Sequence, residues 1–201
     1  MLRTGDQYRN SLLDGREVWI DGKKVKDVPN HPIFKPIVDI RARIYDMAHE
    51  DKFRDKLIYT DEKTKEKNCV GSKLPKSKND WLVKREAIKI ITYEVGAVVT
   101  RMGDETAGEM WSLYDGTDIL NEVDPRFGKN IADHIQKVLK SDIFHVSANT
   151  DPKGDRSKLP QDQDPDMLLH AVKETDKGIV VRGAKYETAA AYANQAFVKP
   201  T

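Results

Sequence analysis

The character of the sequence changes near residue 140, and this change constrains the fold more than any other feature. Before it, apolar residues recur at spacings of three and four, which is typical of amphipathic helices. After it, short runs rich in valine and isoleucine lie between turn residues, which is typical of strands. A run of helices followed by a run of strands indicates an α+β fold. We therefore expect a mainly helical domain over 1–140 and a β-domain over 141–201.

The first part is expected to be helical except for one hairpin and one connector. Thr4 and Gln7 form a capping-box pattern, and Asp21-Gly22 is a favoured hairpin turn pair. Residues 51–80 are charged and rich in lysine, so we expect an exposed connector there. The expected elements are a helix over 4–13, a hairpin over 17–26, and helices over 36–49, 80–101 (capped by Asn79 or Asp80), 103–121 and 125–140.

The second part is expected to contain few strands. They are predicted over 142–149, 167–175, 178–186 and 195–199, with a hairpin turn around Asp176-Lys177-Gly178. Four or five strands make an incomplete β-domain. We therefore expect a fragment of a longer protein, the product of a split gene, or a subunit that needs a partner chain.

Composition excludes several classes of protein. The chain has 34 basic and 33 acidic residues and a net charge of +1, which argues against nucleic-acid binding. The single cysteine, Cys69, cannot form an internal disulfide, so we expect a cytoplasmic protein in which this thiol has no special role. The sequence shows no apolar leader at its start and no apolar run long enough to cross a membrane.

Two segments of the second part have the chemistry of a cofactor site. They are TDPKGDR at 150–156 and GIVVRGAKYETAAAYAN at 178–194. Their glycines, Gly154 and Gly183, permit close approach of the backbone to a ligand. Lys153, Arg156 and Lys185 supply positive charge for an anionic group such as a diphosphate. Neither segment is a GxGxxG fingerprint or a P-loop.

The chain resembles the N-terminal part of the 4-hydroxyphenylacetate 3-hydroxylase family, the oxygenase components of two-component flavin monooxygenases. Three segments carry the resemblance: RTGDQYRNSLLDGREVWIDGKKVKDV at 3–28 with HP at 31–32, TDPKGDRS at 150–157, and DPDMLLHAVKETDKGIVVRGAK at 164–185. The second and third segments are also similar to 4-hydroxybutyryl-CoA dehydratase.

The resemblance implies an acyl-CoA dehydrogenase-like fold: an N-terminal helical domain, a middle β-domain and a C-terminal four-helix bundle, with the bundle absent here. It implies that FAD, reduced by a separate flavin reductase, serves with O2 to hydroxylate a small aromatic substrate. Homo-oligomer formation and a bundle-bearing partner chain are further expectations. The implied FAD-binding residues are Asn149, Thr150, Asp151, Lys153, Arg156, Ser157 and Thr188.

Two further residues are candidates for catalysis. The resemblance implies that Arg101 anchors the phenol, although a cation at this place also suits a helix C-terminus. Where the hydroxylases have a tyrosine and a histidine, this chain has Glu105 and Ser147. His145 lies two residues before Ser147 and, in a regular strand, on the same face. It is the candidate substitute for the missing histidine, against the alternative of a purely structural role.

Two other functions stay open. One is an FAD-containing acyl-CoA dehydratase or isomerase without an iron–sulfur cluster, because Val98 and Met102 stand where the dehydratase has its cysteine pair. The other is a non-catalytic subunit or assembly domain. No metal site is expected, since His31, His134 and His170 lack metal-ligand spacing and DQDPD at 162–166 is typical of a turn.

Overall fold

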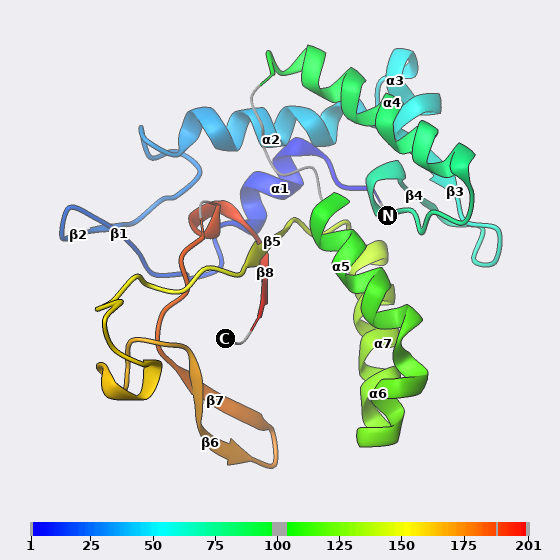
Figure 1. Cartoon of the computed structure of the whole chain (residues 1–201). Coiled ribbons are helices and arrows are strands. Elements are labelled where there is room, and N and C mark those ends of the chain that lie inside the picture. Colours follow the sequence, from blue (N-terminus) through cyan, green and yellow to red (C-terminus); the bar gives the residue numbers. More distant parts are fainter. Residues whose placement is uncertain (1, 98–103, 188, 200–201) are drawn as a thin grey trace. The chain divides into compact units, whose positions relative to one another are not determined.

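The computed structural model describes residues 2–97, 104–187 and 189–199. It divides the chain into two compact units, Met1–Phe144 and His145–Thr201 (Figure 1). The first unit is mainly helical and the second carries short strands. In chain order, the first unit contains α1 (Gly5–Ser11), β1 (Val18–Ile20), β2 (Lys23–Val25), α2 (Lys35–Met47), α3 (Asp51–Leu57), β3 (Ile58–Thr60), β4 (Lys67–Cys69), a 3-10 turn (Val70–Ser72), α4 (Lys78–Glu94), α5 (Asp104–Asp115), α6 (Thr117–Val123) and α7 (Arg126–Ser141).

The start of the chain folds as its local signals predict. The Thr4 hydroxyl accepts a hydrogen bond from the Gln7 backbone at 3.2 Å, and the Gln7 side chain accepts one from the Thr4 backbone at 2.9 Å. This reciprocal pair is the capping box of α1. Asp21 and Gly22 both adopt positive φ, 48° and 72°, between the antiparallel strands β1 and β2. Two left-handed residues are what a tight hairpin turn requires.

Helices α1 and α2 pack closely, and Gly5 makes this possible. A Cβ atom at Gly5 would lie 2.8 Å from the Ala42 carbonyl oxygen, and the Gly5 N–H donates to Asp46 at 2.7 Å. Tyr8, Tyr45 and Phe144 form an aromatic cluster at this contact, with ring centroids of Tyr8 and Tyr45 5.2 Å apart. The cluster anchors one end of the first unit's core.

The expectation that residues 51–80 form only an exposed connector is wrong. The segment contains α3, an antiparallel β3–β4 ladder and the 3-10 turn at Val70–Ser72. Leu57 and Val70 are each 2% exposed and pack in one cluster with Met47, Ala87 and Ile91. Leu57 and Val70, with Phe53 and Tyr59 packed against the same cluster, fix a segment that is otherwise rich in charged residues.

The predicted bounds of α4 need correction at both ends. Ser77, not Asn79 or Asp80, is the N-cap, because its hydroxyl accepts from the Asp80 backbone at 3.2 Å. Asp80 instead accepts hydrogen bonds from the Lys76 backbone and the Ser77 hydroxyl, each at 2.9 Å. The helix ends at Glu94, where Gly96 follows with a φ of 69°.

The predicted helix over 103–121 is two helices. Helix α5 ends at Asp115 and α6 begins after Gly116, which serves as its N-cap. Helix α7 matches its prediction closely, with Pro125 at its N-cap and Asp142 at its C-cap in the left-handed conformation, φ 46°.

The described residues of the second unit form four strands at the predicted places: β5 (His145–Ala148), β6 (His170–Thr175), β7 (Gly178–Arg182) and β8 (Gln195–Val198). Strands β6 and β7 form an antiparallel hairpin, with an irregularity between Ala171 and Lys173. Strands β5 and β8 pair in parallel, with His145 opposite Gln195. Across the described residues, no helix combines the length and apolar composition that crossing a membrane requires.

Candidate cofactor site

The two candidate cofactor segments meet in the second unit. The Tyr186 N–H donates to the Thr150 carbonyl at 2.7 Å, and these two residues form an antiparallel bridge. A second bridge joins Leu168 to Ala184, whose N–H donates to the Met167 carbonyl at 3.1 Å. The backbone that leads into the 150–157 loop is therefore tied to the segment that follows β7.

A largely buried ion pair reinforces this connection. The Lys185 Nζ lies 2.6 Å from Asp151 Oδ1, and the two side chains are 7% and 20% exposed. We expected Lys185 to supply charge for an anionic ligand. In the structure the Lys185 ammonium is paired with Asp151, and its contact with a ligand stays a prediction.

The two glycines serve packing inside the protein. Gly183 has a φ of 116°, and a Cβ atom there would lie 2.3 Å from the Leu168 carbonyl oxygen. Gly154 has a φ of 50°, and a Cβ atom there would lie 2.2 Å from Gln163 Oε1. The Gln163 side chain also accepts from the Asp155 N–H at 2.7 Å. Gly154 thus lets the 150–157 loop approach the 163–168 segment, and Gly183 lets the 183–186 segment after β7 approach it.

Two cations of the loop stay available for a ligand. Lys153 and Arg156 are exposed, and neither forms an ion pair with any residue that the structure describes. The intervening Asp155 is occupied, since it accepts from the Ser157 hydroxyl at 2.7 Å and lies 3.7 Å from Lys158. The hydrogen bond from Ser157 lowers the pKa of Asp155 below its usual value, so this carboxylate stays ionised. Lys153 and Arg156 therefore present uncompensated positive charge to solvent.

The remaining predicted cofactor residues lie at the start of the loop or outside the described part. Asn149 and Thr150 are exposed, with Asn149 Oδ1 accepting from the Ser147 hydroxyl at 3.0 Å. Ser157 closes the turn around Asp155. Thr188 and Arg101 fall outside the described residues.

His145 lies inside the second unit. It is 6% exposed, and its Nε2 lies 3.0 Å from Gln195 Oε1 on the neighbouring strand. Ser147, on the same strand, is 1% exposed. Glu105 lies in the first turn of α5.

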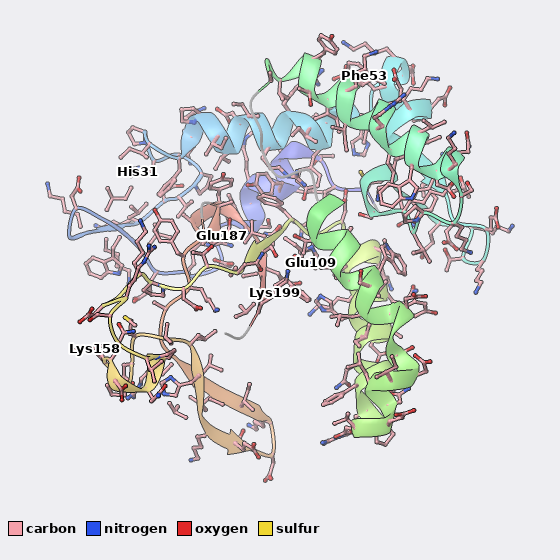
Figure 2. All side chains as sticks on the ribbon, viewed as in Figure 1. His31, Phe53, Glu109, Lys158, Glu187 and Lys199 are labelled. Atoms are coloured by element: carbon pink, nitrogen blue, oxygen red, sulfur yellow. The ribbon has the colours of Figure 1, made fainter. Side chains whose placement is uncertain are left out.

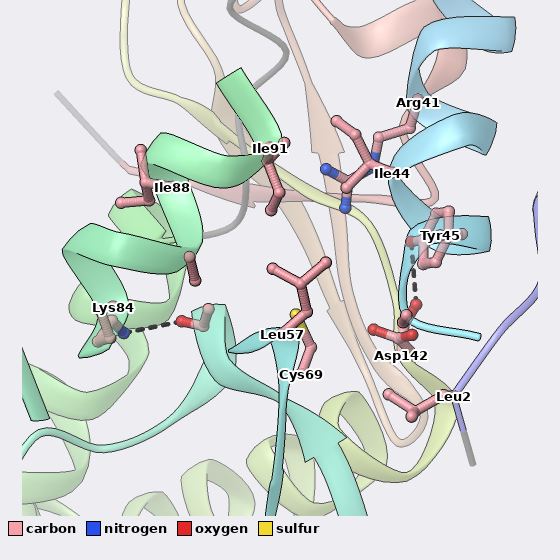
Figure 3. A pocket seen from close by; sticks show the side chains of 13 residues that line it. Leu2, Arg41, Ile44, Tyr45, Leu57, Cys69, Lys84, Ile88, Ile91 and Asp142 are labelled. Atoms are coloured by element: carbon pink, nitrogen blue, oxygen red, sulfur yellow. Dashed lines mark hydrogen bonds between the residues drawn. The ribbon is translucent and has the colours of Figure 1, made fainter. Parts of the chain in front are cut away.

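Sequence reasoning missed a polar cluster in the first unit. The Tyr45 hydroxyl donates to the Asp142 carbonyl at 3.0 Å, and the Asp142 carboxylate accepts from the Arg3 N–H at 3.1 Å. Burial raises the pKa of the Asp142 carboxyl. Tyr45, Asp142, Arg41 and Cys69 line a pocket whose other walls are mostly apolar (Figure 3). No motif marks this cluster, because it joins α2, the chain start and the end of α7.

The histidines have separate surroundings. His31 Nδ1 accepts from the Ile33 N–H at 3.3 Å, and His170 Nδ1 lies 2.8 Å from the Leu168 carbonyl. Burial and the nearby charge of Lys137 lower the pKa of His134. Among the described residues, no three His, Cys, Asp or Glu side chains come together as a metal site would need. The 162–166 segment forms a turn, in which Asp164 accepts from the Asp166 N–H at 2.8 Å.

Comparison with known proteins decides the family. The family model described as "4-hydroxyphenylacetate 3-hydroxylase N terminal" matches residues 4–201, which is nearly the whole chain. The chain belongs to the 4-hydroxyphenylacetate 3-hydroxylase family. The resemblance inferred from the sequence is therefore confirmed.

Individual relatives fall into two groups. The 4-hydroxyphenylacetate 3-monooxygenase oxygenase component of Thermus thermophilus is 29% identical over 203 residues, which cover 100% of this chain and 41% of the relative. The 4-hydroxybutyryl-CoA dehydratase/vinylacetyl-CoA-Delta-isomerase of Clostridium aminobutyricum is 28% identical, with the same coverage of 100% and 41%. The chain thus spans about two fifths of the length of these relatives.

The fold agrees with that of a solved family member. A structure of an oxygenase component of 4-hydroxyphenylacetate 3-monooxygenase, complexed with FAD and 4-hydroxyphenylacetate, superimposes with a TM-score of 0.87 at 29% identity. The match covers 99% of this chain and 41% of that structure. The chain therefore has the mixed helix-and-strand fold of the N-terminal part of that enzyme.

Proposed function

We propose that this chain forms the N-terminal part of the oxygenase component of a two-component, FAD-dependent aromatic hydroxylase. The observation that carries the proposal is the 150–157 loop. Its Lys153 and Arg156 are exposed and form no ion pair with the described residues, while the Tyr186 N–H donates to the Thr150 carbonyl at the start of the loop. Membership of the family and the FAD complex of a relative with the same fold support it.

The residues of the loop fit FAD. A diphosphate needs positive charge and hydrogen-bond donors that are not already satisfied within the protein. Lys153 and Arg156 offer the charge, and the exposed Asn149 and Thr150 side chains offer polar contacts. Thr188 is proposed as a further FAD contact, Ser157 as a support of the loop turn, and Asp151 as its ion-pair anchor.

Each part of the chain then has a separate task. Reduced FAD, when bound, supplies the electrons with which O2 is activated for hydroxylation of a phenol beside its hydroxyl group. The 150–157 loop binds and orients the cofactor, because its entry is fixed by the Thr150–Tyr186 bridge. Arg101 is the proposed anchor for a phenolate or carboxylate of the substrate. His145, held by Gln195, is the proposed replacement for the histidine of the hydroxylases.

The proposed partners follow from this function. They are a flavin reductase, a small aromatic substrate, a polypeptide that supplies the C-terminal four-helix bundle, and further copies of the chain. An acyl-CoA dehydrogenase-like arrangement, with residues 1–140 as the helical domain and 141–201 as part of the middle β-domain, belongs to the same proposal. It agrees with the coverage of 41% of the relatives' length.

A second candidate is an FAD-dependent dehydratase or isomerase that acts on an acyl-CoA. The 28% identity with the Clostridium enzyme favours it. The single cysteine, Cys69, restricts this candidate to chemistry without an iron–sulfur cluster held by this chain's own cysteine pair.

Oxygen uptake separates the two candidates. The chain, together with a polypeptide that supplies the C-terminal part of its relatives, is mixed with a flavin reductase, NADH, FAD and a panel of phenols. The hydroxylase proposal predicts NADH-linked oxygen uptake that forms a catechol. A dehydratase predicts no catechol, and turnover of a hydroxyacyl-CoA instead. Failure of both reactions, together with absence of FAD binding, would favour a non-catalytic subunit.

A further inference from the structure

We infer that Asp151 and Lys185 form a clamp that positions the 150–157 loop for the cofactor. The inference rests on the proposed FAD function and deepens it. It assigns Asp151 and Lys185 to loop position, and it leaves Lys153 and Arg156 as the cations that meet the phosphates. Asp151 then acts on the cofactor through the loop rather than by its own charge.

The burial of the pair supports this assignment. Lys185 Nζ lies 2.6 Å from Asp151 Oδ1, with side-chain exposures of only 7% and 20%. A buried charge whose partner is removed is strongly unfavourable, because it keeps its desolvation cost without compensation. The two residues are separated by 34 positions along the chain. The pair therefore joins two segments that are distant in the sequence. We expect that the two charges separate only when the segments that carry them move apart.

The backbone next to the pair shows what the clamp holds. The residues beside Asp151 and Lys185 are Thr150 and Tyr186, and the Tyr186 N–H donates to the Thr150 carbonyl at 2.7 Å. The side-chain pair and the backbone bridge thus act at the same point, the first residues of the loop. A diphosphate bound by Lys153 and Arg156 would lie two to five residues beyond this point, so its position depends on the clamp.

Charge also favours this division of roles. An unpaired Asp151 carboxylate beside a diphosphate would repel it, and Lys185 removes that repulsion. Conversely, if Lys185 contacted the phosphates directly, Asp151 would lose this ion pair while its side chain stayed largely buried. The pairing observed in the structure avoids both costs.

The loop contains a matched control. Lys158 and Asp155 form an ion pair at 3.7 Å whose side chains are 54% and 51% exposed (Lys158 is labelled in Figure 2). Exposed pairs of this kind contribute little to stability. Lys158→Met therefore removes one positive charge directly after this loop without breaking the Asp151–Lys185 pair.

The test is amide hydrogen exchange in the absence of FAD, followed by FAD titration. The variants are Asp151→Asn, Lys185→Met, the double variant, the conservative Lys185→Arg and the control Lys158→Met. Asp151→Asn and Lys185→Met are each expected to speed exchange of the Tyr186 amide by at least about tenfold. The reference is exchange of the amides in the paired strands β5 and β8, which we expect to follow global unfolding. The double variant should exchange more slowly than the product of the single effects predicts, because both charges are gone together.

Both control variants should exchange the Tyr186 amide within about twofold of the wild-type rate. Lys185→Arg keeps the positive charge that pairs with Asp151, and Lys158→Met removes only an exposed ion pair, which contributes little to stability. FAD affinity should fall in Asp151→Asn and Lys185→Met but be retained in Lys185→Arg. Unchanged Tyr186 exchange in Asp151→Asn and Lys185→Met would overturn the clamp. Loss of FAD affinity in Lys185→Met with unchanged exchange would show that Lys185 meets the phosphates itself.

The failure of the proposed function has a different signature. If the wild type with its complementing polypeptide binds no FAD, the proposed function is wrong, and so is the role of the clamp in cofactor binding. The exchange rates would still decide whether the pair fixes the loop.

Discussion

Replacement of Gly183 by alanine is expected to disrupt the packing of the segment after β7 against Leu168 and Leu169. Gly183 has a φ of 116°, a conformation that residues with a side chain rarely adopt. Holding alanine there costs about 1–3 kcal/mol. In addition, the new Cβ would lie 2.3 Å from the Leu168 carbonyl oxygen and 2.6 Å from the Leu169 Cα, which are backbone atoms. Because backbone must move to relieve this overlap, a further ~1–3 kcal/mol is expected.

Gly178 provides the control that separates these two costs. Its φ is 133°, but a Cβ atom there would meet nothing within 4 Å. Gly178→Ala should therefore cost only the conformational part, about 1–3 kcal/mol. The difference between the two variants then measures the clash alone.

Urea unfolding followed by far-UV circular dichroism gives the two free energies of unfolding. Exchange of the Ala184 amide, which donates to the Met167 carbonyl at 3.1 Å, reports the local effect. Gly183→Ala should exceed Gly178→Ala in both measurements. Equal losses in the two variants would refute the close approach of Leu168 to Gly183, which directly follows β7.

Three further predictions concern the core, the polar cluster and the loop. Leu57→Ala should lower the free energy of unfolding by about 2–5 kcal/mol, because Leu57 is buried. The control Leu13→Ala, at a side chain that is 59% exposed, should change it by less than ~0.5 kcal/mol. Equal effects in urea unfolding would contradict the assignment of Leu57 to the core. Burial raises the pKa of Asp142 in the folded protein above the value of about 3.9 in the unfolded chain. Ionisation of Asp142 therefore lowers the free energy of unfolding as the pH rises from the unfolded-state pKa through the folded-state pKa. Asp142→Asn should therefore gain stability relative to the wild type between low and neutral pH, and a constant difference in unfolding free energy would contradict the burial. Lys153→Met and Arg156→Met should each weaken FAD binding and reduce the dependence of the FAD affinity on salt concentration. FAD titrations at two salt concentrations measure both quantities. If neither changes, the two cations do not contact the cofactor.

The sequence predicts much of the fold because local signals decide it. The Thr4–Gln7 capping box, the Asp21-Gly22 turn and helix α7 form where the pattern places them. The errors arise where tertiary contacts decide. Leu57 and Val70 become core residues because α2 and α4 supply partners that the local sequence does not show.

The sequence marks the 150–157 loop as the candidate cofactor site, which stays a prediction, but it does not reveal the ion pair inside that site. Gly154, Lys153 and Arg156 mark the loop, and the family resemblance adds the cofactor. Nothing in the sequence says that Lys185 pairs with Asp151, since both signs of charge surround each of them along the chain. The pairing depends on the bridge between Thr150 and Tyr186, which is a long-range contact.

The most direct test of the central proposal is an FAD titration of the chain with the polypeptide that supplies the C-terminal part of its relatives. Flavin fluorescence should be quenched to saturation, and Lys153→Met/Arg156→Met should weaken this binding while Lys158→Met leaves it unchanged. Absence of saturable quenching with oxidised and reduced FAD, or equal binding by all three proteins, would contradict the assignment of the 150–157 loop as a flavin site.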